Sequence, residues 1–476
     1  MEVRSMYPDW VLKEKRPGTN ISKIGNNYYL YEVTSQWDKE KKRAKKITKS
    51  YIGRITESGL IPKMERMTRI NADPPLVLHY GGALLASQVG AEILEKLREH
   101  FGPSAETIFT AAALRLLHSH PFKRLEAEYS HSYLSVLFSG LKMGGKSMSS
   151  FLQRLGDDRP AIAEFMKAFM SGTEYILFDG TSIISKSEKM EHNRVGYNAH
   201  RQYDPQVNLL YAFSVESNQP AYYRIVAGNV RDVTAFKLCI EESGIKDMTI
   251  VADKGFGSKE NFELLESAGL RYIVPLRRNS EAYSHTRFES GNKADFDGHF
   301  MFNTRPIWYY SGDGICYFLD SELRAQEEKD YCLRIEKKIE NYTDSSLLDK
   351  QFKFGTIALK TNLNLSPQEV YCLYKQRTNI EQTFDFLKNL MDQDKSYLQS
   401  QAAMEGWAFI NHISLLLCYK LYNLLRDKKL LSRFSIADLI SNLNYIHKIK
   451  ISDTWQTSEI SKKSLALLTE LGITIT

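Results

Sequence analysis

Three acidic residues of this chain stand where they could build one catalytic site. Asp179 follows the apolar run YILF, and Asp253 follows the apolar run TIVA. A carboxylate at the end of a buried strand is held rigidly and still reaches solvent, and two such carboxylates converge if their strands are neighbours. Glu381 can add a third carboxylate from a helix packed against the sheet. Each aspartate alone is more often a turn residue or a helix cap, so only the combination favours chemistry.

Such a set of carboxylates is typical of a site for hard divalent cations. Oxygen ligands suit Mg²⁺, and Mn²⁺ can substitute for it. Two such ions about 3.5–4 Å apart clamp the attacking and leaving oxygens of an in-line phosphoryl transfer. We therefore predict that the three carboxylates are catalytic and bind two Mg²⁺ ions. With these hard ligands available, His192, His200 and His412 are predicted to be structural or DNA-contacting instead.

The segment around Glu381 adds side chains that bind phosphate. The sequence YKQRTNIEQTFDFLK places Tyr374, Arg377, Glu381 and Lys388 at offsets of three, four and seven residues. On one continuous helix these side chains lie within an arc of about 60°, beside an apolar stripe. Arginine offers phosphate a bidentate fork, lysine a point charge and tyrosine a hydroxyl donor. The alternative interpretation is a solvated flank with an ordinary Arg377–Glu381 ion pair.

This helix has a clear start signal. In the stretch LSPQE, Ser366 can serve as the N-cap, Pro367 fits the first helical position and Glu369 the third. Leu365 and Val370 occupy the positions of a hydrophobic staple. The sequence therefore predicts a helix that begins here and continues through the whole segment.

The strands that must position the two aspartates belong to an α/β pattern. The runs EYILFDGTSI, VNLLYAFSVES and AYYRIVAGN predict three strands, and the strands MTIVADKGF and RYIVPL alternate with helices after them. This order outlines a ribonuclease H-like core with a mixed five-stranded sheet and helices. Residues 278–364 are rich in β-formers and predict a mainly β insertion that interrupts this core.

Composition and periodicity divide the chain further. Its 476 residues suffice for two to four domains. We predict six segments: 1–75, a small basic β-rich module; 76–170, a helical and DNA-binding domain with helices broken at GDDRP; 171–277, the first part of the core; 278–364, the insertion; 365–400, the helix of the catalytic glutamate; and 401–476, C-terminal helices.

A cluster of basic residues marks the N-terminal module. The stretch DKEKKRAKK lies between two β-rich runs and contains Lys41, Lys42, Arg43, Lys45 and Lys46. Clustered Lys and Arg on one element are the electrostatic footprint of nucleic-acid binding, so we predict that these residues contact DNA phosphates. The alternative is a solvated, flexible hairpin tip.

Two further residues are DNA-binding candidates. Lys254 follows the second aspartate directly, and Trp308 lies in the insertion, where an aromatic ring could stack on an unpaired base. Packing within the β insertion is the commoner role for such an aromatic residue.

Composition and net charge are consistent with these interpretations but do not by themselves indicate them. The net charge of +6 is mildly basic, and the five cysteines are widely spaced, which favours free thiols over disulfides or a zinc site. No apolar run reaches the length of a membrane span, and the N-terminal residues lack the apolar core of a signal peptide. We expect a cytoplasmic protein with no membrane partner.

With these residues in view, the chain resembles the Asp–Asp–Glu transposases of prokaryotic insertion sequences. Tyr374, Arg377, Glu381 and Lys388 match without gaps the pattern Tyr-x₂-Arg-x₃-Glu-x₆-Lys that marks one group of them. FDGTSI and VADKGF are similar to the motifs of the first and second aspartates, and AGNVRD is similar to the element between them. The resemblance covers about residues 100–450.

The resemblance implies a DNA transposase in the nucleoid of a prokaryote. The three carboxylates would bind the catalytic metals, and Tyr374, Arg377 and Lys388 would hold phosphates of the transposon end. The family cuts element ends, sometimes through a DNA hairpin, and joins the free 3′-hydroxyls to target DNA. Its partners are double-stranded terminal repeats and target DNA, bound by a homodimer on paired ends.

Two other functions remain open at this point. One is a metal-dependent nuclease on the same fold that cuts DNA without joining strands. The other is a domesticated, non-catalytic DNA-binding protein, which the intact set of Asp179, Asp253 and Glu381 opposes.

Overall fold

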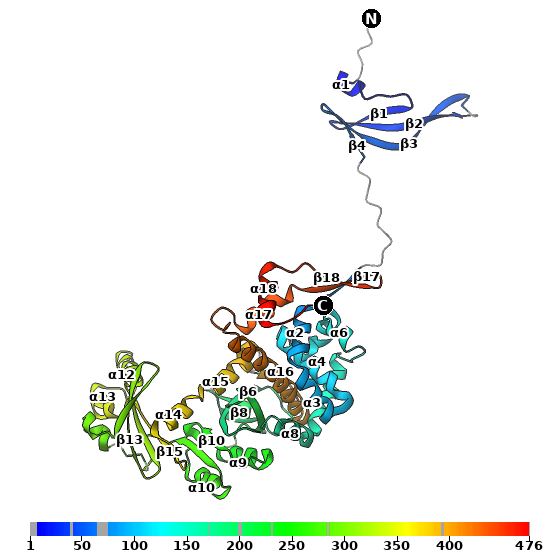
Figure 1. Ribbon diagram of the computed structural model, residues 1–476. Helices are drawn as coiled ribbons and strands as arrows, with labels where there is room; N and C mark the ends of the chain where they lie inside the picture. Colours follow the sequence, from blue (N-terminus) through cyan, green and yellow to red (C-terminus); the bar gives the residue numbers. More distant parts are fainter. Residues whose placement is uncertain are drawn as a thin grey trace. The chain divides into compact units, whose positions relative to one another are not determined.

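The chain forms two units, Met1–Pro75 and Leu76–Thr476. The structure, a computed structural model (Figure 1), describes residues 7–38, 41–63, 75–170, 172–198, 202–229, 232–281, 283–284, 286–391 and 395–475. Lys39 of the basic cluster, His200, and Val230 and Arg231 of the AGNVRD element lie outside the described residues.

The N-terminal unit is a short helix beside an antiparallel sheet in the order β1-β2-β3-β4. Its core is small and consists of Val11, Ile21, Leu30 and Ile55. The two strands predicted here are β2 and β3, and both extend beyond the predicted runs into the basic cluster. The elements are α1 (Asp9–Leu12), β1 (Thr19–Ile24), β2 (Asn27–Asp38), β3 (Arg43–Thr56) and β4 (Gly59–Pro62).

A mixed sheet forms the centre of the larger unit, and its five predicted strands lie side by side in the order β9-β8-β6-β10-β11. β6, β8 and β9 pair antiparallel, whereas β10 and β11 run parallel to β6. The elements are β6 (Tyr175–Ser185), β7 (Arg194–Tyr197), β8 (Tyr203–Ser214), β9 (Gln219–Ala227), α9 (Asp232–Ser243), β10 (Thr249–Ala252), α10 (Lys259–Ser267), β11 (Arg271–Pro275) and β16 (Lys395–Ser396).

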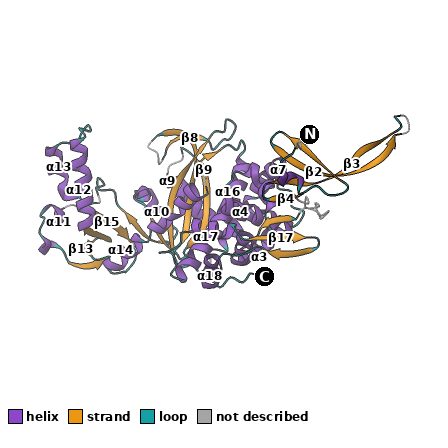
Figure 2. Cartoon of the chain, turned by 90° about the horizontal axis from the view of Figure 1, so that it is seen from above, coloured by secondary structure: helices purple, strands orange, loops and turns teal. Residues whose placement is uncertain are grey.

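The insertion continues this sheet, so the prediction of a five-stranded sheet has to be corrected. β15 pairs antiparallel with β11, and β14, β13 and β12 follow in order, which gives eleven strands among the described residues. β15 thereby covers an edge that would otherwise expose unpaired backbone groups. Helices accompany these strands, and α12 and α13 lie at that end of the sheet (Figures 1 and 2). The elements are α11 (Thr286–Glu289), β12 (Gly298–Phe302), β13 (Arg305–Gly312), β14 (Ile315–Asp320), α12 (Ser321–Glu336), α13 (Asp344–Lys350) and β15 (Thr356–Thr361).

A helical layer packs against the other part of the sheet around one long buried helix, α16 (Gln401–Asp427). α16 contacts α4, α7 and β9. It crosses α7 with the backbones in contact, since a Cβ on Gly156 would lie 1.8 Å from the Ala402 carbonyl oxygen. The other helices are α2 (Gly81–Val89), α3 (Ala91–Phe101), α4 (Ala105–His118), α5 (Leu125–His131), α6 (Leu134–Leu137), α7 (Gly145–Asp157), α8 (Arg159–Lys167), α17 (Ile436–Asn444) and α18 (Lys462–Leu471).

The C-terminal region, predicted to be helical, also contains two strands. β17 (His447–Ile451) pairs with β18 (Thr454–Thr457) and with β5 (Leu76–His79), which joins the two ends of this unit in one small sheet. In the described part of the chain no helix is long and apolar enough to cross a membrane, and all five cysteines are free thiols.

Arg159 ties the helical layer to the sheet through a largely buried ion-pair network. Its guanidinium lies 2.6 Å from carboxylate oxygens of both Glu242 on α9 and Glu405 on α16, and it donates to the Tyr223 carbonyl. Only 17% of the Arg159 side chain is exposed. Although burial opposes ionisation, the hydrogen bond from Arg159 helps to hold the pKa of Glu242 at about 2.

We expect Arg159→Met to lower the free energy of unfolding by about 3–5 kcal/mol, because it leaves buried carboxylates without their partner. Urea unfolding at pH 7 measures the change. Lys237→Met is the matched control, since its ion pair with Glu241 is exposed and is worth less than about 1 kcal/mol. Equal losses in the two variants would show that the network does not carry this stability.

Candidate active site

The register of β6 and β10 brings the two aspartates together. These strands pair in parallel, and the last pair joins Ala252 to Phe178. Asp253 and Asp179 are the next residues of their strands and therefore leave the paired region at the same level. β6 itself continues to Ser185, and its pairing with β8 extends to Ile184. Asp179 therefore lies within the strand, whereas the prediction placed it at the end of the strand. What ends at Phe178 is the pairing with β10.

The helix that carries Glu381 begins as predicted but is not continuous. Ser366 and Glu369 form a reciprocal capping box, with Pro367 in the first turn. The helix then divides into α14 (Pro367–Lys375), α15 (Thr378–Asp385) and a π-helical turn (Phe386–Leu390). At the junction, the N–H groups of Gln376, Arg377, Asn379 and Ile380 bond to carbonyls three residues back, which tightens the turn. The prediction of one helix through Lys388 is therefore wrong.

Arg377 lies at this junction and contacts all three predicted catalytic carboxylates. Its Nη1 atom is 3.1 Å from Asp179 Oδ2 and 3.4 Å from Asp253 Oδ1. Its Nη2 atom is 2.5 Å from Glu381 Oε1. The carboxylates thus converge on one cationic group from strand β6, from the residue that follows β10 and from helix α15. The Arg377–Glu381 pair exists, but it is part of a larger cluster and not an isolated surface pair.

The cluster is partly buried, and burial shifts its charges. Burial raises the pKa of the Asp179 carboxyl to about 6, although Arg377 and the Gly180 N–H oppose the shift. Burial also opposes the charge of Arg377, but the surrounding carboxylates outweigh it and raise the pKa of the guanidinium. Exposure increases from Asp179 at 18% to Asp253 at 31% and Glu381 at 52%, so the cluster opens toward solvent on the side of Glu381.

The donor set fits hard divalent cations. Within the described ranges, no three His, Cys, Asp or Glu side chains are already gathered to hold a metal. The three carboxylates instead surround the Arg377 guanidinium, whose positive charge stands in for that of a metal ion. All of the oxygens are hard ligands of the type that Mg²⁺ and Mn²⁺ prefer. A metal bound to them would therefore replace Arg377 as their partner.

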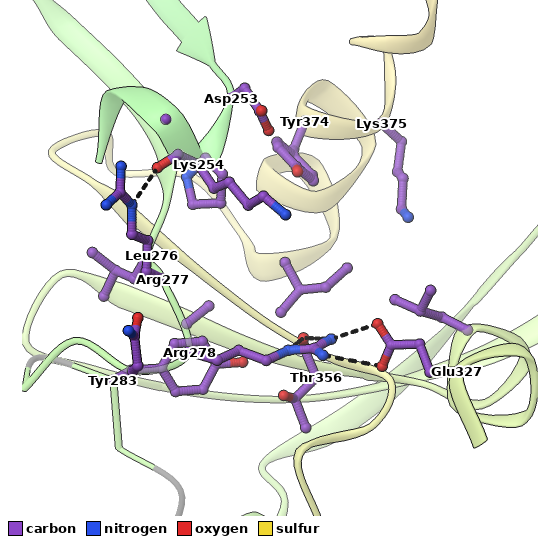
Figure 3. Close-up of a pocket in the computed structure, with 16 residues that line it drawn as sticks. Asp253, Lys254, Leu276, Arg277, Arg278, Tyr283, Glu327, Thr356, Tyr374 and Lys375 are labelled. Atoms are coloured by element: carbon purple, nitrogen blue, oxygen red, sulfur yellow. Dashed lines mark hydrogen bonds and ion pairs between the residues drawn. The ribbon is translucent and has the colours of Figure 1, made fainter. Parts of the chain in front are cut away.

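A cavity of about 650 Å³ adjoins this cluster (Figure 3). Asp253, one of the three carboxylates, lines the cavity together with Tyr374 and the exposed Lys254. Burial raises the pKa of the Tyr374 hydroxyl, so this group stays a neutral hydrogen-bond donor. Of the predicted DNA-contacting residues, the structure thus brings Tyr374, Arg377 and Lys254 to the three carboxylates that were predicted to be catalytic.

Three basic residues of this cavity were missed in the sequence. Arg277 and Arg278 follow β11, and Lys375 precedes the helix junction. Arg278 pairs with Glu327 through two contacts of 3.0 and 3.1 Å, and Arg277 donates to the Lys254 carbonyl (Figure 3). The signal that could have found them is the pair of arginines directly after the strand RYIVPL, at the same sheet edge as Asp253.

The remaining predicted residues lie elsewhere or in a different setting. Lys388 is half-buried on the π-helical turn, which changes its position relative to the expected arc. Trp308 packs against His299 and Phe296 on the insertion, with Lys293 over its ring. His412 is fully buried beside Tyr211 and Tyr223, and burial lowers its pKa to about 3, as suits a structural residue.

The pKa of Asp179 predicts a stability change with a definite sign. A folded value near 6, against the ordinary 3.8, means that folding favours the protonated carboxyl. The contribution of Asp179 to the free energy of unfolding is therefore full below about pH 4 and is lost as the pH rises through 6. The loss amounts to about 3 kcal/mol. We expect Asp179→Asn to be more stable than the unsubstituted protein at pH 8 and equally stable at pH 4.

Urea unfolding of both proteins at the two pH values measures this difference. Asp385→Asn is the control, because that exposed carboxylate on α15 bonds only to Asn389 among the described contacts. An Asp179→Asn protein that is less stable at pH 8 would contradict the assignment of a burial penalty to this carboxylate.

Comparisons with known proteins identify the family of this chain. Residues 171–417, just over half of the chain, match the family described as "Transposase DDE domain". No curated protein matches the chain. Among solved structures, a piggyBac transposase synaptic complex with hairpin DNA is 11% identical, over 79% of this chain and 81% of that chain, with a TM-score of 0.40. Two Mos1 structures, a paired-end complex with the left transposon end and a mariner paired-end complex with Mn, are 9% and 10% identical. They cover 61% and 67% of this chain and 80% and 98% of their own chains, each with a TM-score of 0.15.

Proposed function

This chain belongs to the family of transposases with a DDE domain, and on that premise we propose that it cuts DNA at the ends of an insertion sequence and joins the freed 3′-hydroxyls to target DNA. The observation that carries the proposal is the convergence of Asp179, Asp253 and Glu381 on the guanidinium of Arg377. A family match alone does not assign residues, and it is this convergence that supports these three carboxylates as the proposed metal ligands.

The proposed roles follow from the contacts. Asp179, Asp253 and Glu381 would hold two Mg²⁺ ions, or Mn²⁺ in their place, and such ions activate the attacking oxygen and stabilise the leaving oxygen of a phosphodiester. Arg377 holds the three carboxylates together in the absence of metal, and its planar fork matches a phosphate once the carboxylates take another partner. Tyr374 offers a neutral hydroxyl donor at the same place.

The neighbouring cavity supports a DNA backbone as the substrate. Four cations line it, Lys254, Arg277, Arg278 and Lys375, against the two acidic residues Asp253 and Glu327. A surface of this charge next to the carboxylates suits phosphates on either side of a scissile bond. The aromatic Trp308 and the half-buried Lys388 stay in the proposal as further DNA contacts on the insertion and the π-helical turn.

The helical layer offers a second basic surface. A cavity of about 640 Å³ on α7 is lined by Lys142, Lys146 and Arg154 together with several hydroxyl groups and no acidic residue. α7 and α8 also form the two helices expected from the sequence, with the break at Asp158. We propose that residues 76–170 contact the terminal inverted repeats through this surface.

The finer assignments are inferred from the resemblance. The sheet order β9-β8-β6-β10-β11 supports a ribonuclease H-like core. The match to the Tyr-x₂-Arg-x₃-Glu-x₆-Lys pattern supports the corresponding group of prokaryotic insertion sequences, whose members work as homodimers on paired ends. We place the protein in the cytoplasm at the nucleoid, where such DNA lies.

A labelled element end distinguishes this function from the nuclease alternative. The DNA that flanks the gene is first searched for imperfect inverted repeats bracketed by a short direct duplication. A duplex that ends in one repeat is then incubated with the protein, Mg²⁺ and a circular target. We expect labelled ends covalently joined to the target. Cleavage without any joined product would favour a nuclease, and binding without cleavage would favour a domesticated DNA-binding protein.

A further inference from the structure

The β2–β3 ribbon of the N-terminal unit extends beyond the small core of that unit. Six residue pairs, from Val33–Thr48 to Asp38–Arg43, join the two strands in this part. Every residue from 43 to 50 is exposed, and so are the facing residues 34–37. A two-stranded ribbon with both faces in water buries little apolar surface and is marginally stable by itself. The ribbon therefore contributes little to the stability of the unit, which indicates a role other than folding.

The ribbon also holds most of the excess positive charge of the chain. Residues 33–49 contain seven Lys and Arg and two Asp and Glu, a net charge of +5, while the whole chain carries +6. Lys39 and Glu40 cancel each other and lie outside the described residues, so the described part keeps the net charge of +5. Such a density of like charge in a short ribbon favours a polyanionic partner.

The cations of the ribbon are not neutralised within the described unit. No carboxylate there pairs with the side chains of Lys41, Lys42, Arg43 or Lys45. Lys46 bonds to the Asn20 side chain at 2.8 Å and keeps its charge. The basic stretch was expected between two strands, but Arg43, Lys45 and Lys46 lie in strand β3 itself. Arg43 and Lys45 are on one face of the ribbon and Lys46 is on the other. Cations on both faces suit a groove whose two walls are charged.

A large aromatic residue stands among these charges. Trp37 is 63% exposed and pairs with Ala44, the small neighbour of Arg43. By the alternation of the strands it shares a face with Ser35 and Lys46. An exposed tryptophan between cations has apolar surface to bury, and no ring of the described residues of this unit stacks on it.

We propose that the β2–β3 ribbon enters the major groove of duplex DNA. Six residue pairs span about 20 Å, or about six base pairs, and a two-stranded ribbon fits a groove about 12 Å wide. Lys41, Lys42, Arg43 and Lys45 contact phosphates of the two groove walls, and Trp37 packs on sugars or thymine methyl groups. The inference rests on the proposed function only in that DNA is the partner, and it concerns a unit outside the matched family region.

The salt dependence of DNA binding tests the proposal. The full chain is titrated with a duplex of about thirty base pairs in EDTA, so that no cutting occurs, at several salt concentrations. Each phosphate contact contributes about 0.9 to the slope of log K against log salt. The variant with Lys41, Lys42, Arg43 and Lys45 all changed to Gln is expected to lose about 3–4 from this slope. The control changes Lys237, Lys259, Lys428 and Lys429 to Gln and removes the same charge from exposed sites elsewhere.

Trp37 supplies the second readout. We expect DNA to quench part of the tryptophan fluorescence, and this part to be absent in Trp37→Phe. Equal slopes for the ribbon variant and its control would overturn the proposal, as would fluorescence quenching that is unchanged in Trp37→Phe. The proposal would also be overturned if the ribbon variant lost binding of the full chain to anionic lipid vesicles and kept its affinity for DNA. If the unsubstituted protein bound no DNA, the proposed function itself would be contradicted. Ribbon variants that keep full DNA binding and strand joining would contradict only the proposed role of the ribbon.

Discussion

Asp253→Asn is expected to reduce the cutting of an element end by about 10³-fold or more, because a carboxylate that holds the catalytic cations contributes several kcal/mol to the barrier. Asp253 is the carboxylate shared between the Arg377 cluster and the basic cavity, and the substitution keeps its size and removes its charge. The cleavage rate of a labelled duplex in Mg²⁺ is the measurement. Binding of the same duplex in EDTA should change by less than about tenfold, since the cations of the cavity remain.

The control for this change is Asp385→Asn on the same helix as Glu381. Asp385 is exposed, accepts a hydrogen bond from Asn389 at 2.6 Å and lies outside the contacts of Arg377. It should cut at close to the original rate. Retained cleavage in Asp253→Asn would exclude Asp253 from the site, and a loss of DNA binding equal to the loss of cleavage would assign it a binding role only.

Arg377→Gln is expected to change metal binding and DNA cutting in opposite directions. Without DNA, the guanidinium competes with any cation for three carboxylates, so its removal should tighten Mn²⁺ binding by about tenfold or more, which corresponds to about 1.4 kcal/mol. With DNA, the variant lacks the fork that matches a phosphate, and cutting should decrease by about 10²-fold. Calorimetric titration with Mn²⁺ and the cleavage assay measure the two effects.

Two variants separate the charge of Arg377 from its shape. Arg377→Lys keeps the positive charge and loses the planar fork, so Mn²⁺ binding should stay near the original value while cutting decreases. Arg278→Gln removes an equally bidentate arginine from the neighbouring cavity, where it pairs with Glu327. Its Mn²⁺ affinity should not change. If Arg377→Gln weakened Mn²⁺ binding, Arg377 would help to shape the metal site and would not compete with it.

The positions of the two aspartates followed from simple rules on strands. Asp253 directly follows the apolar strand β10, as the rule expects, whereas Asp179 lies within β6. The two strands are parallel neighbours whose last pair is Phe178–Ala252, so their next residues lie at one level. The capping box at Ser366 could also be predicted, because it depends on local hydrogen bonds that the side chains of Ser366 and Glu369 make.

The interruption of the helix could not be predicted from the sequence, for a physical reason. The tight turn at Gln376 and Arg377 consists of backbone bonds to carbonyls three residues back, which no residue type in this stretch specifically favours. Spacing on an ideal helix placed Arg377 beside Glu381 and missed its contacts with both aspartates. The π-helical turn has the same effect on Lys388, whose position depends on one extra residue per turn.

The extent of the sheet was also hidden from the sequence. Strand pairing between β11 and β15 uses backbone groups and joins segments about ninety residues apart, Ile273 to Thr361 in one pair. The runs of the insertion predict strands but not the edge on which they continue. The basic cavity depends on this continuation, since β15 and α12 supply part of its wall.

The most direct test of the site is the position of Mn²⁺ in crystals of the full chain with a duplex that ends in the terminal repeat. Anomalous scattering locates manganese independently of the protein coordinates. We predict manganese between the carboxylates of Asp179, Asp253 and Glu381, with the Arg377 guanidinium displaced onto a DNA phosphate. Manganese bound elsewhere, with Arg377 still bonded to Asp179 and Glu381, would contradict it.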